Sequence, residues 1–201
     1  MKNLPNIPMY DPQTGELNPY YEELTGKNNP MQLKIPFKEH DVPFVNEVEE
    51  FNHTFGKPNN YKPTIPDRKE WMFVYDFIME ELEEYKHACE TGDIVEILDA
   101  LCDITYVSLG NGAMLHGLKG KIWKAYQEVQ ASNMSKSCET KEEAEETVRV
   151  RSEEKKHKCH WEQVGDRYVV YRSSDNKVMK SINYFAPYLK QFFTDEEIKN
   201  S

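Results

Sequence analysis

Residues 68–112 read RKEWMFVYDFIMEELEEYKHACETGDIVEILDALCDITYVSLGNG, and they decide the fold. Apolar residues recur at helical spacing on both sides of the turn signal Thr91-Gly92-Asp93. Asp67 is a plausible N-cap for the helix before this turn. The second helix, over residues 94–115, is apolar on nearly all sides, as in a buried helix. Because the turn is short, the stretch predicts an antiparallel pair of helices.

Two further helices flank this pair. From Pro43, apolar residues at helical spacing run as far as Gly56, which predicts a first helix followed by a proline-containing loop. Residues 119–136 predict an amphipathic fourth helix that ends near Ser132 and Asn133. The sequence therefore predicts a mainly α fold, with a four-helix bundle over residues 44–137.

The remaining parts of the chain differ in composition. Residues 1–43 contain seven prolines and predict an extended arm. Residues 138–159 are highly charged with little apolar face, so we expect a solvated helical connector. Residues 160–201 alternate apolar and polar residues between turn signals, which predicts a small three-stranded antiparallel β-meander.

Composition narrows the function. The formal net charge of −10 disfavours binding to a nucleic acid polymer, although an acidic protein can bind a polyphosphate through divalent cations. The chain shows no signal-peptide pattern and no membrane-length apolar run, so we expect a cytoplasmic protein without a membrane partner. The four cysteines form no CxxC pair, which disfavours a zinc site.

Carboxylates interrupt the apolar faces of both central helices. On a helical wheel Glu81 lies between Phe77 and Tyr85, and Glu80 and Glu84 follow along the same edge. Buried carboxylates need a compensating charge. Two or three carboxylates of the first central helix therefore intrude on its apolar face.

The second central helix repeats this pattern. Asp99 and Asp103 share one stripe with Glu96, and neither helix carries a Lys or Arg on its inner face. A site whose ligands are all carboxylate oxygens, with no paired Cys or His, favours Mg²⁺ or Mn²⁺ over other metal ions. The alternative to a metal ion is that these carboxylates form ion pairs with Lys or Arg of the helix that starts at Pro43 or of the fourth helix. A di-iron centre is disfavoured because Glu84-x-x-His87 occurs only once, and His87 projects towards the solvent side.

Three motifs resemble the MazG-like and phosphoribosyl-ATP pyrophosphohydrolase-like superfamily of all-α nucleotide pyrophosphohydrolases. They are EELEEY at residues 80–85, DALCDITYVSLGNG at 99–112 and EVQASNMSK at 128–136. The first corresponds to the family pattern EExxE, which falls on Glu80, Glu81 and Glu84 and leaves Glu83 outside. The resemblance covers roughly residues 44–137 and implies the bundle predicted above.

The second motif departs from the family pattern, which is ExxD followed by an aliphatic pair and tyrosine. Residues 103–106 fit its second half, but Ala100 stands where a glutamate is expected and Asp99 precedes it. A variant interpretation takes Glu96 and Asp99 as the acidic pair. Both interpretations place Asp99 near the metal ions.

The resemblance implies hydrolysis of a nucleoside triphosphate to a monophosphate and pyrophosphate, for nucleotide-pool control, with Mg²⁺ or alternatively Mn²⁺ as cofactor. It implies a general base at Glu80 or Glu81 and a homodimer or homotetramer. The implied metal ligands are Glu81, Glu84, Glu96, Asp99 and Asp103.

The third motif implies substrate contacts. Asn133 would contact the sugar or base and Lys136 a phosphate, and Tyr106 is a candidate contact for the base. A plain helix end at Ser132-Asn133 is an equally good interpretation.

Two other functions stay open. One is a nucleotide-binding regulatory module or helical scaffold without catalysis, in which the proline-rich arm and the meander are interaction surfaces. The other is hydrolysis of a phosphoribosyl nucleotide, to which the terminal segments lend no support.

Overall fold

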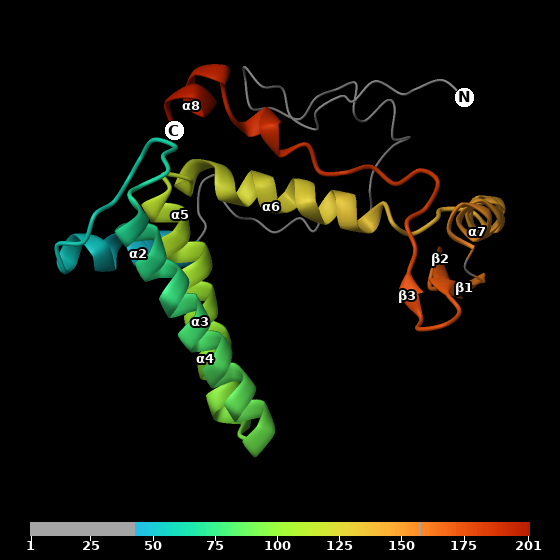
Figure 1. Ribbon diagram of the computed structural model, residues 1–201, viewed down its shortest axis with the longest axis horizontal. Coiled ribbons are helices and arrows are strands. Elements are labelled where there is room, and N and C mark those ends of the chain that lie inside the picture. The colour runs from blue at the N-terminus through green and yellow to red at the C-terminus, as the bar shows by residue number, and fades with distance from the viewer. Residues whose placement is uncertain (1–42, 157) are drawn as a thin grey trace. The chain divides into compact units, whose positions relative to one another are not determined.

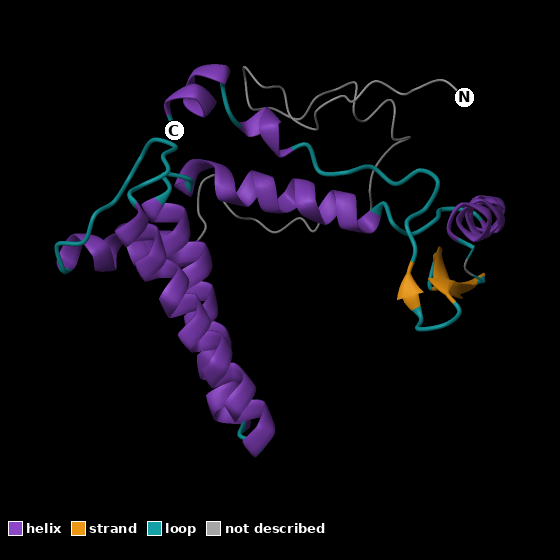
Figure 2. Ribbon diagram, viewed as in Figure 1, coloured by secondary structure: helices purple, strands orange, loops and turns teal. Residues whose placement is uncertain are grey.

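The computed structural model describes residues 43–156 and 158–201, so the predicted arm lies almost wholly outside the described residues. The described chain is mainly helical with a small sheet, which confirms the predicted fold class (Figure 1; Figure 2). It divides into two compact units, one containing residues up to 124 with 190–201 and the other residues 125–189. The elements are α2 (Pro43–Thr54), α3 (Arg68–Thr91), α4 (Ile94–Thr105), a π-helix (Tyr106–Asn111), α5 (Gly112–Leu115), α6 (Lys119–Met134), α7 (Lys141–Lys155), β1 (Cys159–Val164), β2 (Arg167–Arg172), β3 (Lys177–Val178), a 3₁₀ helix (Leu189–Phe192) and α8 (Asp195–Asn200).

The helices α3 and α4 form the predicted antiparallel hairpin (Figure 1). Asp67 caps α3 by accepting a hydrogen bond from the backbone N–H of Glu70 at 3.0 Å. Gly92 ends α3 in the left-handed conformation at φ +75°, and Asp93 caps α4. The three turn residues therefore do what their types predict.

The second central helix does not continue unbroken to residue 115, as we had expected. It widens into the π-helix and closes with the short helix α5. At Gly110 a Cβ atom would lie 2.3 Å from Cγ2 of Val48, so glycine lets α2 approach the π-helix closely. Local widening of this kind is common at functional sites and at close packing contacts.

The core of the first unit lies at one end of the hairpin. Its buried residues are Val45 and Val48 of α2 with Ala113 and Met114 of α5. Ile122 and Trp123 of α6 pack against this cluster. The predicted bundle is therefore only partly closed within one chain, because α2 packs at one end and much of the hairpin stays exposed.

The second unit contains the predicted meander, with strand order β1-β2-β3 and both pairs antiparallel. Helix α7 differs from the expected solvated connector, because Ala144 and Thr147 are fully buried. Ala144 belongs to the core that Cys138, Val170 and Met179 form with the sheet. The packing face of α7 is narrow because small residues form it. The many charged residues around them made this face hard to predict from the sequence.

Candidate active site

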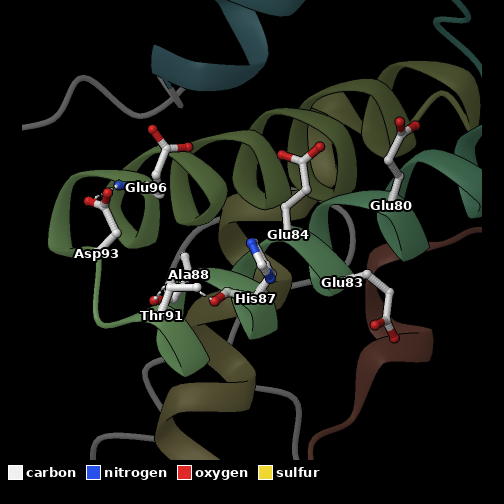
Figure 3. Close-up of a pocket in the computed structure, with 8 residues that line it drawn as sticks. All are labelled: Glu80, Glu83, Glu84, His87, Ala88, Thr91, Asp93 and Glu96. Atoms are coloured by element: carbon white, nitrogen blue, oxygen red, sulfur yellow. Dashed lines mark hydrogen bonds between the residues drawn. The ribbon is translucent and has the colours of Figure 1, made fainter.

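The hairpin carries an open acidic pocket of about 700 Å³. Figure 3 shows the side chains of Glu80, Glu84 and Glu96 pointing towards the same side of the hairpin. Glu83 points away from them and forms an ion pair with Lys86 at 3.2 Å. The pocket thus gathers three of the predicted acidic residues, and Glu83, which the motif excludes, also lines it but turns its carboxylate towards Lys86.

Glu81 is the most unusual carboxylate of this site. It is half-buried, and its Oε2 atom is buried without a hydrogen-bond partner among the described residues. Burial raises the pKa of Glu81 first, and the negative charges of Asp103, Glu84, Glu80 and Asp99 raise it further. The predicted carboxylates of the two helices therefore act on one another electrostatically.

Among the residues that the structure describes, no cation balances the charge of these carboxylates. Within residues 43–156 and 158–201, no Lys, Arg or His forms an ion pair with any of the six predicted carboxylates. The alternative partners from the first and fourth helices are engaged elsewhere, because Lys119 pairs with Glu49 and Lys121 with Glu197. A buried, unpartnered carboxylate oxygen beside further carboxylates suits a divalent cation.

The described His, Cys, Asp and Glu side chains nevertheless form no ready-made cluster of three metal ligands. Most of these carboxylates are exposed on long side chains, so they are free to rotate towards a cation. The residues present fit a metal ion in chemistry and in charge. Their side chains would have to converge to bind it.

His87 is on the solvent side, as predicted, and also lines the pocket. Its exposed ring lines the pocket one turn after Glu84 (Figure 3). The spacing of Glu84 and His87 was the available signal, because residues three apart share a helix face. His87 is therefore a candidate contact for a ligand bound in the pocket.

The structure also locates the departure from the family motif. Ala100 is 3% exposed, so a glutamate at this position would be buried. Asp99 is exposed and Asp103 half-buried. Glu96 is the residue of the second acidic motif that lines the pocket.

The three predicted substrate contacts lie outside the pocket. Tyr106 packs against the first core and meets the ring of Phe51 edge-on, with 6.0 Å between centroids. Asn133 and Lys136 lie at the end of α6 in the second unit, where Nζ of Lys136 donates to Oδ1 of Asn133 at 2.7 Å. Their contacts with a substrate stay predictions.

Carboxylates on both helices of a hairpin, with no balancing cation among the described residues, have the charge and the oxygen ligands that suit divalent metal ions. The family model of phosphoribosyl-ATP pyrophosphohydrolase matches residues 48–133. That family belongs to the MazG-like superfamily of all-α nucleotide pyrophosphohydrolases, so the match confirms the resemblance inferred from the motifs.

The family implies a nucleotide pyrophosphohydrolase and is generally dependent on a divalent metal ion. A search of curated proteins found no match to the chain. None of the helices described in the two ranges has the length and apolar character needed to cross a membrane.

Proposed function

We propose that the protein is an Mg²⁺-dependent nucleoside triphosphate pyrophosphohydrolase that releases a monophosphate and pyrophosphate. The observation that carries this proposal is the buried, unpartnered Oε2 of Glu81 among carboxylates from both helices. An acidic face without a balancing cation repels a triphosphate unless divalent cations lie between them. The proposal therefore requires the metal ion for binding as well as for chemistry.

Each carboxylate has a role in this scheme. Glu81, Glu84, Glu96, Asp99 and Asp103 would hold the cations, with Mn²⁺ as an alternative to Mg²⁺. When bound, such cations screen the phosphates, stabilise charge on the transferring group and make a water molecule easier to deprotonate.

Glu80 or Glu81 would take the proton from the attacking water. The water oxygen bonds to a phosphorus atom of the α–β bridge as the bridging P–O bond breaks. The monophosphate and pyrophosphate then leave, and one of these two products carries the oxygen atom of the attacking water.

We also propose that the active form is a homodimer or homotetramer. The hairpin exposes large apolar side chains on both helices, more than a stable monomer usually shows. A second hairpin packed against them would complete a four-helix bundle. These side chains are Phe73, Tyr75, Met79, Leu82 and Tyr85 on α3, and Ile94, Val95, Leu98 and Leu101 on α4.

Sedimentation analysis tests the assembly. We expect Leu98→Glu to shift the protein towards the monomer, because Leu98 is 64% exposed in the single chain and would be buried between hairpins. Val178→Glu adds the same charge to an exposed apolar residue of β3 and serves as the control. A strictly monomeric wild type contradicts the proposal.

Product analysis tests the reaction. The purified protein is incubated with each ribo- and deoxyribonucleoside triphosphate and with phosphoribosyl-ATP, with and without Mg²⁺, and monophosphate products are separated from diphosphates. We expect monophosphate and pyrophosphate from nucleoside triphosphates only when Mg²⁺ is present. Phosphoribosyl-ATP belongs in the panel because the matching family model carries that substrate in its description.

Paired variants test the site. Asp103→Asn and Glu81→Gln each remove one proposed ligand charge, and we expect turnover to fall by about a hundredfold or more. Glu83→Gln removes the same charge from the same helix, but the Glu83 side chain points away from those of Glu80, Glu84 and Glu96 and pairs with Lys86, so we expect turnover to change little. A fully active Asp103→Asn would overturn the site assignment. Nucleotide and Mg²⁺ binding without turnover in the wild type would favour the regulatory module.

A further inference from the structure

The segment that follows the sheet is tied to the end of α6, within the second unit. The backbone N–H of Ser181 donates to the carbonyl of Lys136 at 3.1 Å. The hydroxyl of Ser132, a buried residue, donates to the carbonyl of Phe185 at 2.8 Å. The backbone N–H of Phe185 donates to the Ser135 hydroxyl at 3.2 Å. These bonds hold residues 180–185 in place beside the third motif.

This arrangement brings two lysines to one tyrosine. Nζ of Lys180 lies 4.0 Å from the ring centroid of Tyr184, and the Tyr184 hydroxyl lies 3.5 Å from the Ser132 hydroxyl. The Ser132 hydroxyl lowers the pKa of Tyr184 most, and Lys180 and the charge of Lys136 lower it further. Both ammonium groups are therefore close enough to act on the same hydroxyl.

The two lysines lack the acidic partners that most other cations of the unit have. Among the described residues, no carboxylate lies within 4.0 Å of Lys136 or Lys180. The Lys136 ammonium group donates one hydrogen bond to the Asn133 side chain, and its two other N–H groups remain available to a ligand. The cations of this unit with ion-pair partners are Lys141, Arg149, Arg151, Arg167 and Arg172.

We propose that Lys136, Lys180 and Tyr184 form an anion site that binds the phosphate groups of a nucleoside polyphosphate. Two uncompensated ammonium groups beside hydroxyl donors suit a ligand with several charged oxygens better than a single carboxylate. The choice of ligand rests on the proposed function, which gives the protein a nucleotide substrate. Lys180 and Tyr184 lie beyond residues 48–133, so they extend the binding residues past the matched segment.

Direct binding to the full-length protein tests the site independently of turnover. The probe is α,β-methylene-ATP, which cannot be hydrolysed between its α and β phosphorus atoms, titrated calorimetrically in the presence of Mg²⁺. We expect Lys180→Ala to weaken binding about tenfold, because it removes one charge-assisted contact. Lys180→Arg keeps the charge and should retain most of the affinity, and Tyr184→Phe should weaken binding by a smaller factor.

Lys177→Ala is the matched control. It removes the same charge from the same unit, at an exposed position in β3. We expect it to leave the affinity within about twofold of the wild type, since distant exposed charges are screened by salt. Circular dichroism of each variant shows whether its fold is intact.

The outcomes separate this inference from the proposed function. Equal losses in Lys177→Ala and Lys180→Ala would overturn the site, because the effect would then come from net charge alone. Unchanged affinity in Lys180→Ala, or no binding to the wild type, would overturn it as well. A wild type that hydrolyses nucleotides while Lys180→Ala binds normally would refute only the anion site. Selective loss in Lys180→Ala without any turnover by the wild type would refute only the hydrolase.

Discussion

Gly117 allows the loop after α2 to lie directly against the chain between α5 and α6. It adopts φ +66°, and a Cβ atom added there would lie 2.0 Å from the carbonyl oxygen of Lys62. The three nearest atoms that it would meet are all backbone atoms of Lys62, so no side chain can rotate away. Gly117→Ala must therefore move the loop or the turn.

The structure sets the magnitude of this effect. An alanine in the left-handed region costs about 1–2 kcal/mol. Moving the loop would also weaken two backbone bonds, from Asn60 N to Met114 O at 3.0 Å and from Thr64 N to His116 O at 3.1 Å. Each contributes about 1 kcal/mol. We expect Gly117→Ala to reduce the free energy of unfolding by about 3–4 kcal/mol in total.

Gly92→Ala isolates the contribution of the clash. Gly92 has φ +75°, but an added Cβ would meet no atom within 4 Å. This variant should therefore show only the backbone cost of about 1–2 kcal/mol. Urea unfolding followed by far-ultraviolet circular dichroism measures both losses. Equal losses in the two variants would refute the close approach of Gly117 to Lys62.

Three further predictions concern stability. Met114→Ala should reduce the free energy of unfolding by about 2–5 kcal/mol, because Met114 is fully buried in the first core; urea titration measures the loss. Without metal, wild-type stability should fall as the pH rises from 4.5 through the raised pKa of Glu81, and Glu81→Gln should remove this fall and the thermal stabilisation by Mg²⁺. Arg172 lowers the pKa of Asp175 from 3.8 to about 2. The Asp175 carboxylate therefore contributes fully to folding stability above pH 3.8, and this contribution is lost as the pH falls through about 2; melting curves of Asp175→Asn should lack this pH dependence.

The hairpin could be predicted from sequence because its signals are local. Asp67, Gly92 and Asp93 each satisfy a requirement of the adjacent helix end, and the structure uses all three as predicted. The carboxylates of the site were also visible, because an acidic residue within an apolar stripe conflicts with helical periodicity. Glu81 illustrates this, since its unusual position on the wheel corresponds to a partly buried side chain.

Features that depend on distant contacts could not be predicted. The π-helix contains Gly110, which lies against Val48, a residue far away in the sequence. The packing of α7 depends on Ala144 and Thr147, which are too small and too few to produce an apolar stripe. His87 is exposed, as the wheel predicted, but its place in the pocket could not be predicted, because a wheel built for one helix ignores the second helix that completes the pocket.

The structure also explains how the site accommodates the alanine in its second acidic motif. Ala100 lies buried in the hairpin, where a glutamate would need a partner for its charge. Glu96 lines the pocket beside Glu84, whereas Asp103 is the residue whose charge raises the pKa of Glu81 most. The acidic residues of the motif thus differ in position, because Glu96 lines the pocket and Asp103 is half-buried in the hairpin, while Ala100 between them is buried.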